Sequence, residues 1–512
     1  MITKAEVEIY SHIIDASGIV DLLTVDQSPR GRPPAFPTAL RSTMIGMLMS
    51  ISKNGSATLV SAHKMLTERL SYEAQIMLDV RRNDGAVISL KIVERVWGKA
   101  IENLAWTSNS APHVRIRDRV TRRKRARQIC DQLMDVFVIG PTSPSFALDA
   151  TGIRSWSRGK RGATRTSSGI HRGHSDPEAA DGYKTAGVGE SDQMFGYHNH
   201  VLVQIPDGKK HTPTPAILIR RFELFPANQN SGSEIFRMLR RLPRNEQLKE
   251  LIVDRGYSYL KPEKWAQKLA ANGIDQVLDL RSDEHDYDAT EGIIWADGFP
   301  HCPGTPTSMF KVQKPAPGNS SPRVIEKFHQ KIEKRKQYAM HIHERKLAKQ
   351  RLVITCPAAR GTVGCPLKPG SVANARAHNL PIISPPSASN HVACCAPDVD
   401  SVTVTLAPKQ LKHQQRRYWG SRQWAEAFSR RTYVEGVFGQ QRNKNLEALG
   451  RGQHQFMGLA ANTLVFALIA ASYNLRALRS WNTAQPNPRN DHPLLAEFEE
   501  GIIGYENPDQ AA

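Results

Sequence analysis

Residues 145–152 read Ser145-Phe-Ala-Leu-Asp149-Ala-Thr-Gly152, and the short apolar run at their start ends on an aspartate. A second run, Lys249-Glu-Leu-Ile-Val-Asp254-Arg-Gly-Tyr257, repeats this arrangement farther along the chain. Apolar runs of this length predict buried strands, here over 145–153 and 249–254. Because ligands gather at strand ends in α/β folds, Asp149 and Asp254 are candidates for one shared site if the two strands are neighbours.

The surrounding pattern predicts a mixed α/β sheet. Further strands are expected over 194–205, 215–224 and 276–280, and helices over 233–242 and 262–271. The polar stretch 156–181 is predicted to be a loop, and residues 325–350 a highly charged helix. Residues 1–110 have the apolar spacing of helices, which favours either a DNA-docking helical domain or a small structural bundle.

A third acid lies in Phe428-Ser-Arg-Arg431-Thr-Tyr-Val-Glu435-Gly-Val-Phe-Gly-Gln-Gln-Arg442-Asn-Lys444. In a helix, Arg431, Glu435 and Arg442 would share one face, since they lie four and seven residues apart. A surface ion pair is the ordinary explanation for a carboxylate in such a place. Its combination with two aspartates at strand ends instead indicates a divalent-metal site, because carboxylates hold the ions that activate phosphodiester chemistry. Asp279, which also ends an apolar run, is the main rival ligand.

The composition favours a polyanionic partner. The 512 residues carry a net charge of +20, and the isoelectric point is about 9.7. Nucleic acid is a better match than a membrane, because no apolar run reaches the roughly 18 residues that span a bilayer. Residues 115–127 contain eight Arg or Lys and one acid, so Arg122, Arg123, Lys124 and Arg125 are predicted to contact phosphates; a solvated surface is the alternative. We expect a cytoplasmic, nucleoid-associated protein.

The three acidic segments resemble those of the DDE transposases of bacterial insertion sequences, which have an RNase H-like catalytic fold. Many of these proteins carry Tyr-x2-Arg-x3-Glu-x6-Lys around the glutamate, and this chain has the same spacing with Phe428 in place of Tyr and Arg442 in place of Lys. The segment that begins at Asp254 also resembles the family's second-aspartate motif. The resemblance covers about residues 140–280 and 415–475.

The resemblance implies that Asp149, Asp254 and Glu435 bind Mg²⁺ or Mn²⁺, as two ions, and are the catalytic residues. They would cut the ends of an insertion sequence, and the freed 3′ ends would attack target DNA. Arg431, Arg442 and Lys444 would hold phosphates, and a homodimer is expected on the DNA. A DNA-binding derivative that no longer cuts and a metal-dependent nuclease without strand transfer are the alternatives.

The expected domains follow from these segments. They are a helical N-terminal domain (1–114), a basic connector (115–140), the catalytic core in two parts (141–284 and 413–482), an insertion between them (285–412) and a loose C-terminal tail (483–512). The insertion contains five of the six cysteines. Structural thiols are favoured over a zinc site there, because no Cys-x2-Cys pair occurs. Trp295 is expected to be a buried strand residue rather than a base-stacking one.

Overall fold

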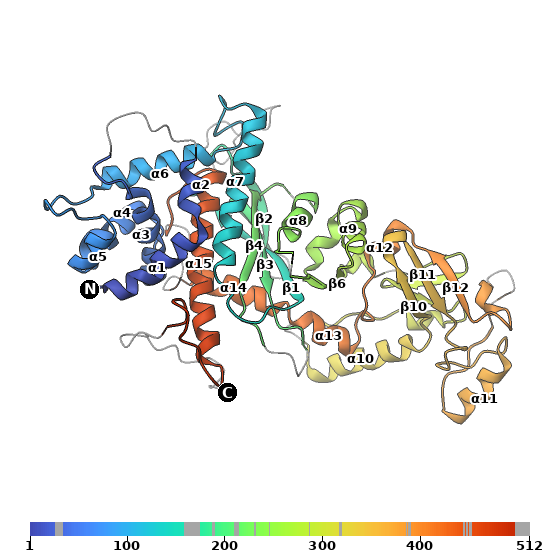
Figure 1. Ribbon diagram of the computed structural model, residues 1–512. Helices are drawn as coiled ribbons and strands as arrows, with labels where there is room; N and C mark the ends of the chain where they lie inside the picture. The colour runs from blue at the N-terminus through green and yellow to red at the C-terminus, as the bar shows by residue number, and fades with distance from the viewer. Residues whose placement is uncertain are drawn as a thin grey trace.

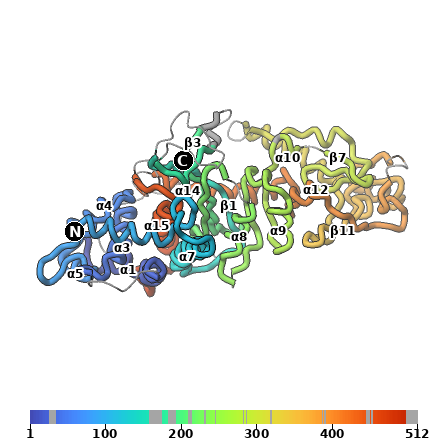
Figure 2. The backbone as a smooth tube through the Cα atoms, turned by 90° about the horizontal axis from the view of Figure 1, so that it is seen from above, coloured from blue at the N-terminus to red at the C-terminus, as the bar shows by residue number. Residues whose placement is uncertain are grey.

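The structure is a computed structural model, and it describes three bodies in a row (Figures 1 and 2). N-terminal helices lie at one end, a sheet with its covering helices in the middle, and the insertion at the other end. The description covers the whole chain except residues 26–33, 158–174, 187–189, 209–213, 230–231, 245, 286, 317–319, 386, 388–390, 444–445, 447–448, 450–452 and 497–512.

The N-terminal body consists of short helices around one buried helix, α3 (Ala39–Asn54). Twelve of the 16 residues of α3 are buried. The other helices of this body are α1 (Lys4–Ser17), α2 (Ile19–Thr24), α4 (Leu59–Lys64), α5 (Tyr72–Met77) and α6 (Leu90–Leu104), and a π-helical turn (Met65–Arg69) continues α4. These helices share one continuous hydrophobic core with the central body. The N-terminal helices are therefore packed firmly onto the sheet domain.

The central body is a mixed sheet built around β1 (Ser145–Arg154). On one side, β1 pairs antiparallel with β3 (Glu190–Gln204), and β3 pairs antiparallel with β2 (Ala180–Ala186) and β4 (Ile219–Pro226). On the other side, β1 runs parallel to β5 (Glu250–Val253), which runs parallel to β6 (Asp275–Leu278). The expected mixed α/β sheet is thus confirmed.

Helices cover this sheet. α7 (Ile116–Asp135), α8 (Gly232–Leu239) and α15 (Leu459–Thr483) contact β4, while α14 (Thr432–Arg442) contacts β1 and β3. α9 (Ala266–Ala271) connects β5 to β6 and packs on β6. α15 also packs against α3 and α7, and 18 of its 25 residues are buried. It therefore joins the N-terminal helices to the sheet.

The insertion has its own small core. It contains two three-stranded antiparallel sheets: β7 (Tyr287–Thr290), β8 (Ile293–Ala296) and β9 (Phe299–His301), then β10 (His341–Lys346), β11 (Arg351–Thr355) and β12 (Ser401–Thr405). Its helices are α10 (Pro322–Lys336), α11 (Pro369–Ala377) and α12 (Pro408–Lys412). The chain then returns to the sheet through α13 (Arg422–Ser429) and α14.

Four expectations about secondary structure are corrected. The predicted loop 156–181 ends in a strand, β2, so the sheet has six strands rather than five. The predicted helix 325–350 ends at Lys336, and its second half forms β10, because Ile342 and its neighbours pair with β11. The predicted connector 115–140 is largely the helix α7, whose Ala126, Ile129 and Leu133 are buried.

The fourth correction concerns the C-terminal segment. The part of the predicted loose tail that the structure describes, up to Ala496, is anchored to the rest of the protein, although most of its residues are exposed. Leu494 and Leu495 are buried in the main core, and Asn482 exchanges hydrogen bonds with the backbone of Arg489. Apolar burial and side-chain capping therefore order this segment. Separately, no helix among the described residues is long and apolar enough to cross a membrane.

Candidate active site

Two neighbouring strands place Asp149 and Asp254 side by side. β1 and β5 run parallel, and Leu148 is paired with Val253. Asp149 is the next residue of β1, in the middle of that strand, and Asp254 directly follows β5. The two aspartates therefore lie beside each other where the β1–β5 pairing ends, on strands that stand about 4.8 Å apart. The Asp254 side chain caps the 3₁₀ turn Arg255–Tyr259 by accepting a hydrogen bond from the Arg255 amide at 2.7 Å.

The third acid reaches this point from a helix. Glu435 lies in the first turn of α14, a helix that packs on β1 and β3. Val434, Val437 and Phe438 are buried on the sheet side of the helix. Glu435 remains about half exposed (47%) on the side that faces solvent. The helix thus holds a charged group beside the sheet edge while its apolar side is packed.

Arg431 links the helix to the sheet. One nitrogen of its guanidinium lies 3.2 Å from the Asp149 carboxylate, and another lies 2.7 Å from the Glu435 carboxylate. A planar guanidinium can satisfy two separate acids in this way, whereas an ammonium is a point charge. The predicted i,i+4 pair therefore exists, but it also includes Asp149, which is 282 residues away along the chain.

Arg442 lies at the other end of α14 and contacts the same strand. Its guanidinium donates to the hydroxyl of Thr151, two residues after Asp149. Burial lowers the pKa of Arg442, while the nearby Asp149 raises it. The two arginines thus flank Asp149 along β1. The third predicted phosphate contact, Lys444, lies outside the described residues.

The electrostatics at the sheet edge favour a cation. Burial, together with the charges of Asp254 and Glu435, raises the pKa of Asp149 to about 6, although Arg431 opposes the shift. Near the aspartates, whose charges act on Tyr257, the Tyr257 hydroxyl and His200 Nδ1 are hydrogen-bonded at 2.8 Å. Burial lowers the pKa of His200 to about 3 and, with both aspartates, raises the pKa of Tyr257. Both groups are therefore neutral near pH 7, and the cations that balance the acids among the described residues include Arg431, which pairs with two of them, and Arg442, which lies near Asp149.

The donor set fits a hard divalent ion. Asp149, Asp254 and Glu435 offer carboxylate oxygens, the ligands that Mg²⁺ and Mn²⁺ prefer. Each additional negative charge raises the cost of ionising Asp149, and a divalent cation would reverse that cost. In the present conformation, no three acidic, His or Cys side chains of the described residues are gathered tightly enough to hold one ion. Coordination would therefore require movement of side chains, Arg431 first.

The rival carboxylate has a structural role. Asp279 follows β6, two strands from β1, and it pairs with Lys314 at 2.7 Å and accepts a hydrogen bond from the Trp419 indole at 3.3 Å. Asp279 is also largely buried. Because Leu278 pairs with Val253, Asp279 lies at the same end of the parallel strands as Asp254, one strand farther from Asp149, but its carboxylate has its own partners. Trp295 is buried on β8, as expected, rather than available for base stacking.

Phe428, which stands where the family has a tyrosine, belongs to an aromatic stack. The Phe428 ring lies parallel to the Trp424 ring, with the centroids 5.0 Å apart. Lys314 lies above both rings, and Arg431 lies 5.6 Å from the Phe428 centroid. Cations are attracted to aromatic faces, so this stack supports the position of Arg431 without a hydroxyl. Sequence reasoning missed Trp424 and Lys314, because neither lies in the acidic motifs.

The basic run on α7 is only partly available to a ligand. Arg123 lies 3.2 Å from both Glu223 and Glu234, and Arg122 donates to the carbonyls of Glu102 and Ala105. These two arginines have protein partners that stabilise the fold, and Arg125 also has an interaction partner. Lys124 is exposed. The prediction that all four residues contact phosphate is therefore weakest for Arg122 and Arg123.

A row of cations on α10 was not singled out from the sequence. Arg323, Lys327, Lys331 and Lys334 are exposed and lie four, four and three residues apart, which places them along one side of the helix. Among the described residues these four form no ion pair, since the acids Glu326 and Glu333 pair with Arg422 and Lys336. The Arg422–Glu326 pair ties α10 to α13, next to α14 (Figure 1). A spacing of three and four residues was the signal that could have revealed this row.

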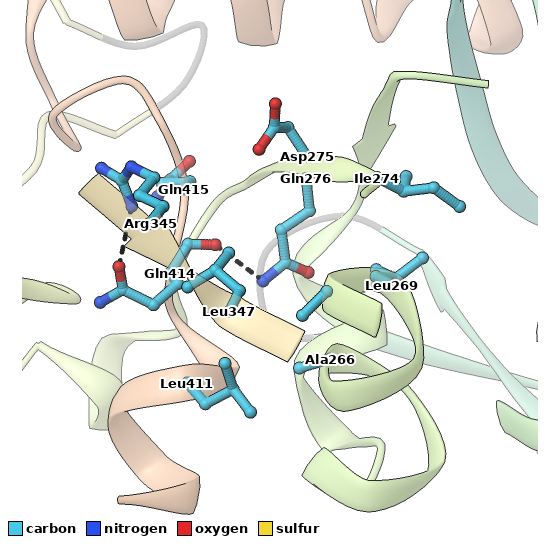
Figure 3. A pocket seen from close by; sticks show the side chains of 11 residues that line it. Ala266, Leu269, Ile274, Asp275, Gln276, Arg345, Leu347, Leu411, Gln414 and Gln415 are labelled. Carbon is cyan, nitrogen blue, oxygen red and sulfur yellow. Dashed lines mark hydrogen bonds between the residues drawn. The ribbon is translucent and has the colours of Figure 1, made fainter. Parts of the chain in front are cut away.

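A small pocket marks the seam between the sheet and the insertion (Figure 3). Gln276 on β6 donates to the carbonyls of Lys412 and Gln414, and Arg345 on β10 donates to the Gln414 side chain. Burial lowers the pKa of Arg345 to about 10. The free volume is about 10 Å³, room for no more than one water molecule. This pocket is therefore part of the packed contact between the sheet and the insertion, and it is too small to be a ligand site.

Comparisons with known proteins do not assign this geometry. No protein-family model, no curated protein and no solved structure matches the chain. The function has to be argued from the site itself, since a fold class alone does not determine chemistry.

The charge balance predicts a stabilising response to Mg²⁺. At pH 7.5 Asp149 is ionised, so saturating Mg²⁺ should raise the midpoint of thermal unfolding by roughly 3–5 °C. At pH 5 the response should shrink, because Asp149 is then mostly protonated. Asp149→Asn should abolish the response at both pH values, and Asp283→Asn, which changes an exposed carboxylate after β6, should preserve it. An equal Mg²⁺ response in the wild type and Asp149→Asn would contradict the site.

Arg431 and Arg442 should differ in their tolerance to lysine. Arg431 bridges two acids with separate nitrogens, so Arg431→Lys should lower metal-dependent cleavage of DNA roughly 10- to 100-fold. Arg442 makes a single contact with Thr151, so Arg442→Lys should stay within about threefold of the wild type. Rates would be measured on the same labelled duplex. Near-normal rates for both variants would show that positive charge alone is sufficient.

Proposed function

We propose that this protein is a DDE-type transposase, with an RNase H-like catalytic domain. It would bind the ends of an insertion sequence, cut them by metal-dependent hydrolysis and join the freed 3′ ends to target DNA. One observation carries the proposal: the parallel register of β1 and β5 brings Asp149 beside Asp254, and Arg431 ties Asp149 to Glu435. Three acids from distant segments thus converge at one edge of the sheet, in the order that the family resemblance implies.

The strand arrangement supports the RNase H-like part of the proposal. The first strand, β1, lies inside the sheet, with antiparallel strands on one side and parallel strands on the other. The aspartates occupy the first strand and the strand parallel to it, and the glutamate comes from a helix packed on the sheet. The two small sheets of the insertion come after β6 and before the glutamate helix in the chain.

Each residue of the candidate site would have a separate role in metal or phosphate binding. Asp149, Asp254 and Glu435 would hold two Mg²⁺ or Mn²⁺ ions, which supply an activated oxygen nucleophile and neutralise charge on the phosphate. Arg431 would release its carboxylates and turn to a phosphate oxygen, where its planar fork can make two bonds. Arg442 would hold a second phosphate beside β1. The neutral, hydrogen-bonded pair of Tyr257 and His200 would add no charge near the acids.

The surface charge supports DNA as the substrate. The net charge is +20, and the four exposed cations lie on α10, which the Arg422–Glu326 pair ties to α13, the helix before α14. Phosphate contacts position a duplex without reading its sequence. α10 and the exposed part of α7 would therefore guide a duplex toward the sheet edge. A homodimer on the DNA remains part of the proposal, as the resemblance implies.

Two alternative functions make different predictions. A silent DNA-binding derivative would bind the same DNA but would not cut it in Mg²⁺. A nuclease without strand transfer would cut but would leave no joined product. The presence of all three acids around Arg431 favours the cutting functions over the silent one.

Single changes to the acids should separate cutting from binding. Asp149→Asn, Asp254→Asn and Glu435→Gln should each reduce Mg²⁺-dependent cleavage by at least about 10³-fold, a barrier increase of about 4 kcal/mol. The substrate is a labelled duplex made from the DNA that flanks the coding sequence. Binding should be unchanged or tighter, because removing a negative charge does not weaken attraction to phosphate.

The control for these changes is Asp283→Asn, which removes an exposed carboxylate outside the site. It should cleave at the wild-type rate. Retained cutting by Glu435→Gln would move the third ligand elsewhere. Cleavage without joining to a second duplex would favour the nuclease.

The row on α10 should contribute to DNA binding through phosphate contacts. Changing Arg323, Lys327, Lys331 and Lys334 together to Gln should weaken binding and make its salt dependence shallower, by about 0.9 in the slope of log K against log salt for each phosphate that is no longer neutralised. Binding would be followed by fluorescence anisotropy in the non-cutting Asp149→Asn background. The matched control changes Lys336 and Arg422, which are already paired with acids, and should leave the slope unchanged. An identical slope in both variants would mean that the row is only a solvated surface.

A further inference from the structure

Five cysteines of the insertion gather in one small core. Four of them, Cys302, Cys356, Cys365 and Cys394, are buried there, and Cys395 packs against the same core. They come from separate parts of the chain: Cys302 follows β9, Cys356 follows β11, Cys365 precedes α11, and Cys394–Cys395 form a 3₁₀ turn before β12. The sixth, Cys130, is buried in α7 within the other core. The clustering is therefore confined to the insertion.

Three of these cysteines begin similar turns. Each is followed by proline, as Cys302-Pro303, Cys356-Pro357 and Cys365-Pro366. The Cys302 and Cys365 carbonyls accept hydrogen bonds from the amides three residues on, and the Cys356 carbonyl accepts from the amide four residues on. Because proline restricts the residue before it to extended conformations, each cysteine backbone is held at the start of its turn.

The turns also direct amide groups at the sulfur atoms. The Cys356 sulfur accepts from the amides of Ala358 and Ala359, and the Cys365 sulfur from those of Leu367 and Lys368. The Cys302 sulfur accepts from the Gly304 amide. Amides that point at a sulfur stabilise its thiolate form, which is the form that binds a metal. Hydrogen bonds of this kind are the usual support around thiolate ligands.

A lysine holds the cysteine segments together. The Lys368 ammonium donates to the carbonyls of Ala396, Pro397 and Val399 and to the Asp400 carboxylate. The amide of Cys356 donates to the Asp400 carbonyl at 2.8 Å. These bonds tie the turns of Cys356 and Cys365 to the loop that follows Cys395. The lysine also contributes positive charge near Cys356 and Cys395.

Neighbouring thiols shift one another's pKa. A hydrogen bond with the Cys394 thiol lowers the pKa of Cys356 to about 6, and the same contact raises the pKa of Cys394. Burial, together with Cys356, Cys395 and Cys365, raises the pKa of Cys302 to about 12. The Cys356 and Cys394 thiols therefore lie within hydrogen-bond reach of each other, although they come from different turns.

We propose that Cys302, Cys356, Cys365 and one thiol of the adjacent pair Cys394–Cys395 bind one structural Zn²⁺ ion. Four thiolates suit zinc, which closes a tetrahedral site with sulfur at about 2.3 Å. The described thiols are neighbours but do not yet surround one point, so binding would draw them inward by rotation of the side chains. The ion would stabilise a small core made of two three-stranded sheets and long loops, the kind of domain that often depends on a metal.

The test measures metal in the full-length protein. Protein carrying Asp149→Asn, so that the carboxylate site does not contribute, would be produced with added zinc and dialysed against metal-free buffer. Mass spectrometry of the elements should find about one zinc per chain. Cys356→Ser and Cys365→Ser should lower the zinc content at least fivefold, whereas Cys130→Ser should not. The result does not depend on DNA cleavage, so failure of the proposed function would leave it standing.

A second measurement covers variants that fold poorly. Replacement of zinc by Co²⁺ in the Asp149→Asn protein should produce the intense absorption of thiolate-to-cobalt charge transfer, and a thiol-blocking mercurial should release the metal. Loss of metal in Cys394→Ser or Cys395→Ser identifies the fourth ligand. The proposal is overturned if the folded protein lacks zinc, if it contains iron instead, if both of these variants keep the full metal content, or if the Co²⁺ protein lacks thiolate absorption.

Discussion

The parallel pairing of β1 with β5 is the constraint on which the candidate site depends. The register sets Leu148 opposite Val253, so the next residue after each of them is an aspartate, where the pairing ends. A shift of one residue would turn one of the carboxylates to the other face of the sheet, because side chains alternate along a strand. The apolar residues before each aspartate, which are buried on the sheet, therefore determine where the acids meet.

Arg431 resolves the electrostatic problem that this register creates. Two aspartates on neighbouring strands and a glutamate on the covering helix repel one another, and burial makes the repulsion stronger. The guanidinium balances part of this charge by reaching Asp149 and Glu435 together. It is in turn placed by the Phe428–Trp424 stack. In a site that binds metal ions, such an ion could take the place of the Arg431 guanidinium beside the acids. The guanidinium would then be available to bind a phosphate.

Local sequence patterns predicted the strands of the aspartates and the helix of the glutamate, because each has a clear periodicity of apolar residues. They did not predict β2, whose polar residues pair only with the extended part of β3. The same patterns predicted that α10 continues through β10. The charged segment His341–Lys346 has no strong preference for helix or strand, and its pairing with β11 makes it a strand. The acidic partners of Arg123 were equally hidden, because Glu223 and Glu234 are about 100 residues away. Non-local ion pairs leave no spacing in the sequence.

The seam at the base of the insertion explains how a site can be assembled from such distant parts. The chain leaves the sheet after β6 and returns at Gln414–Gln415, where the Gln415 side chain exchanges hydrogen bonds with the backbone of Leu278. Trp424 donates to the same carbonyl, and Gln276 donates to two carbonyls of the returning segment. With its two ends fastened together, the insertion acts on the sheet like a short loop, whatever its length. The Glu435 helix can therefore dock on β1 as though it followed β6 directly, while the insertion folds around a core of its own.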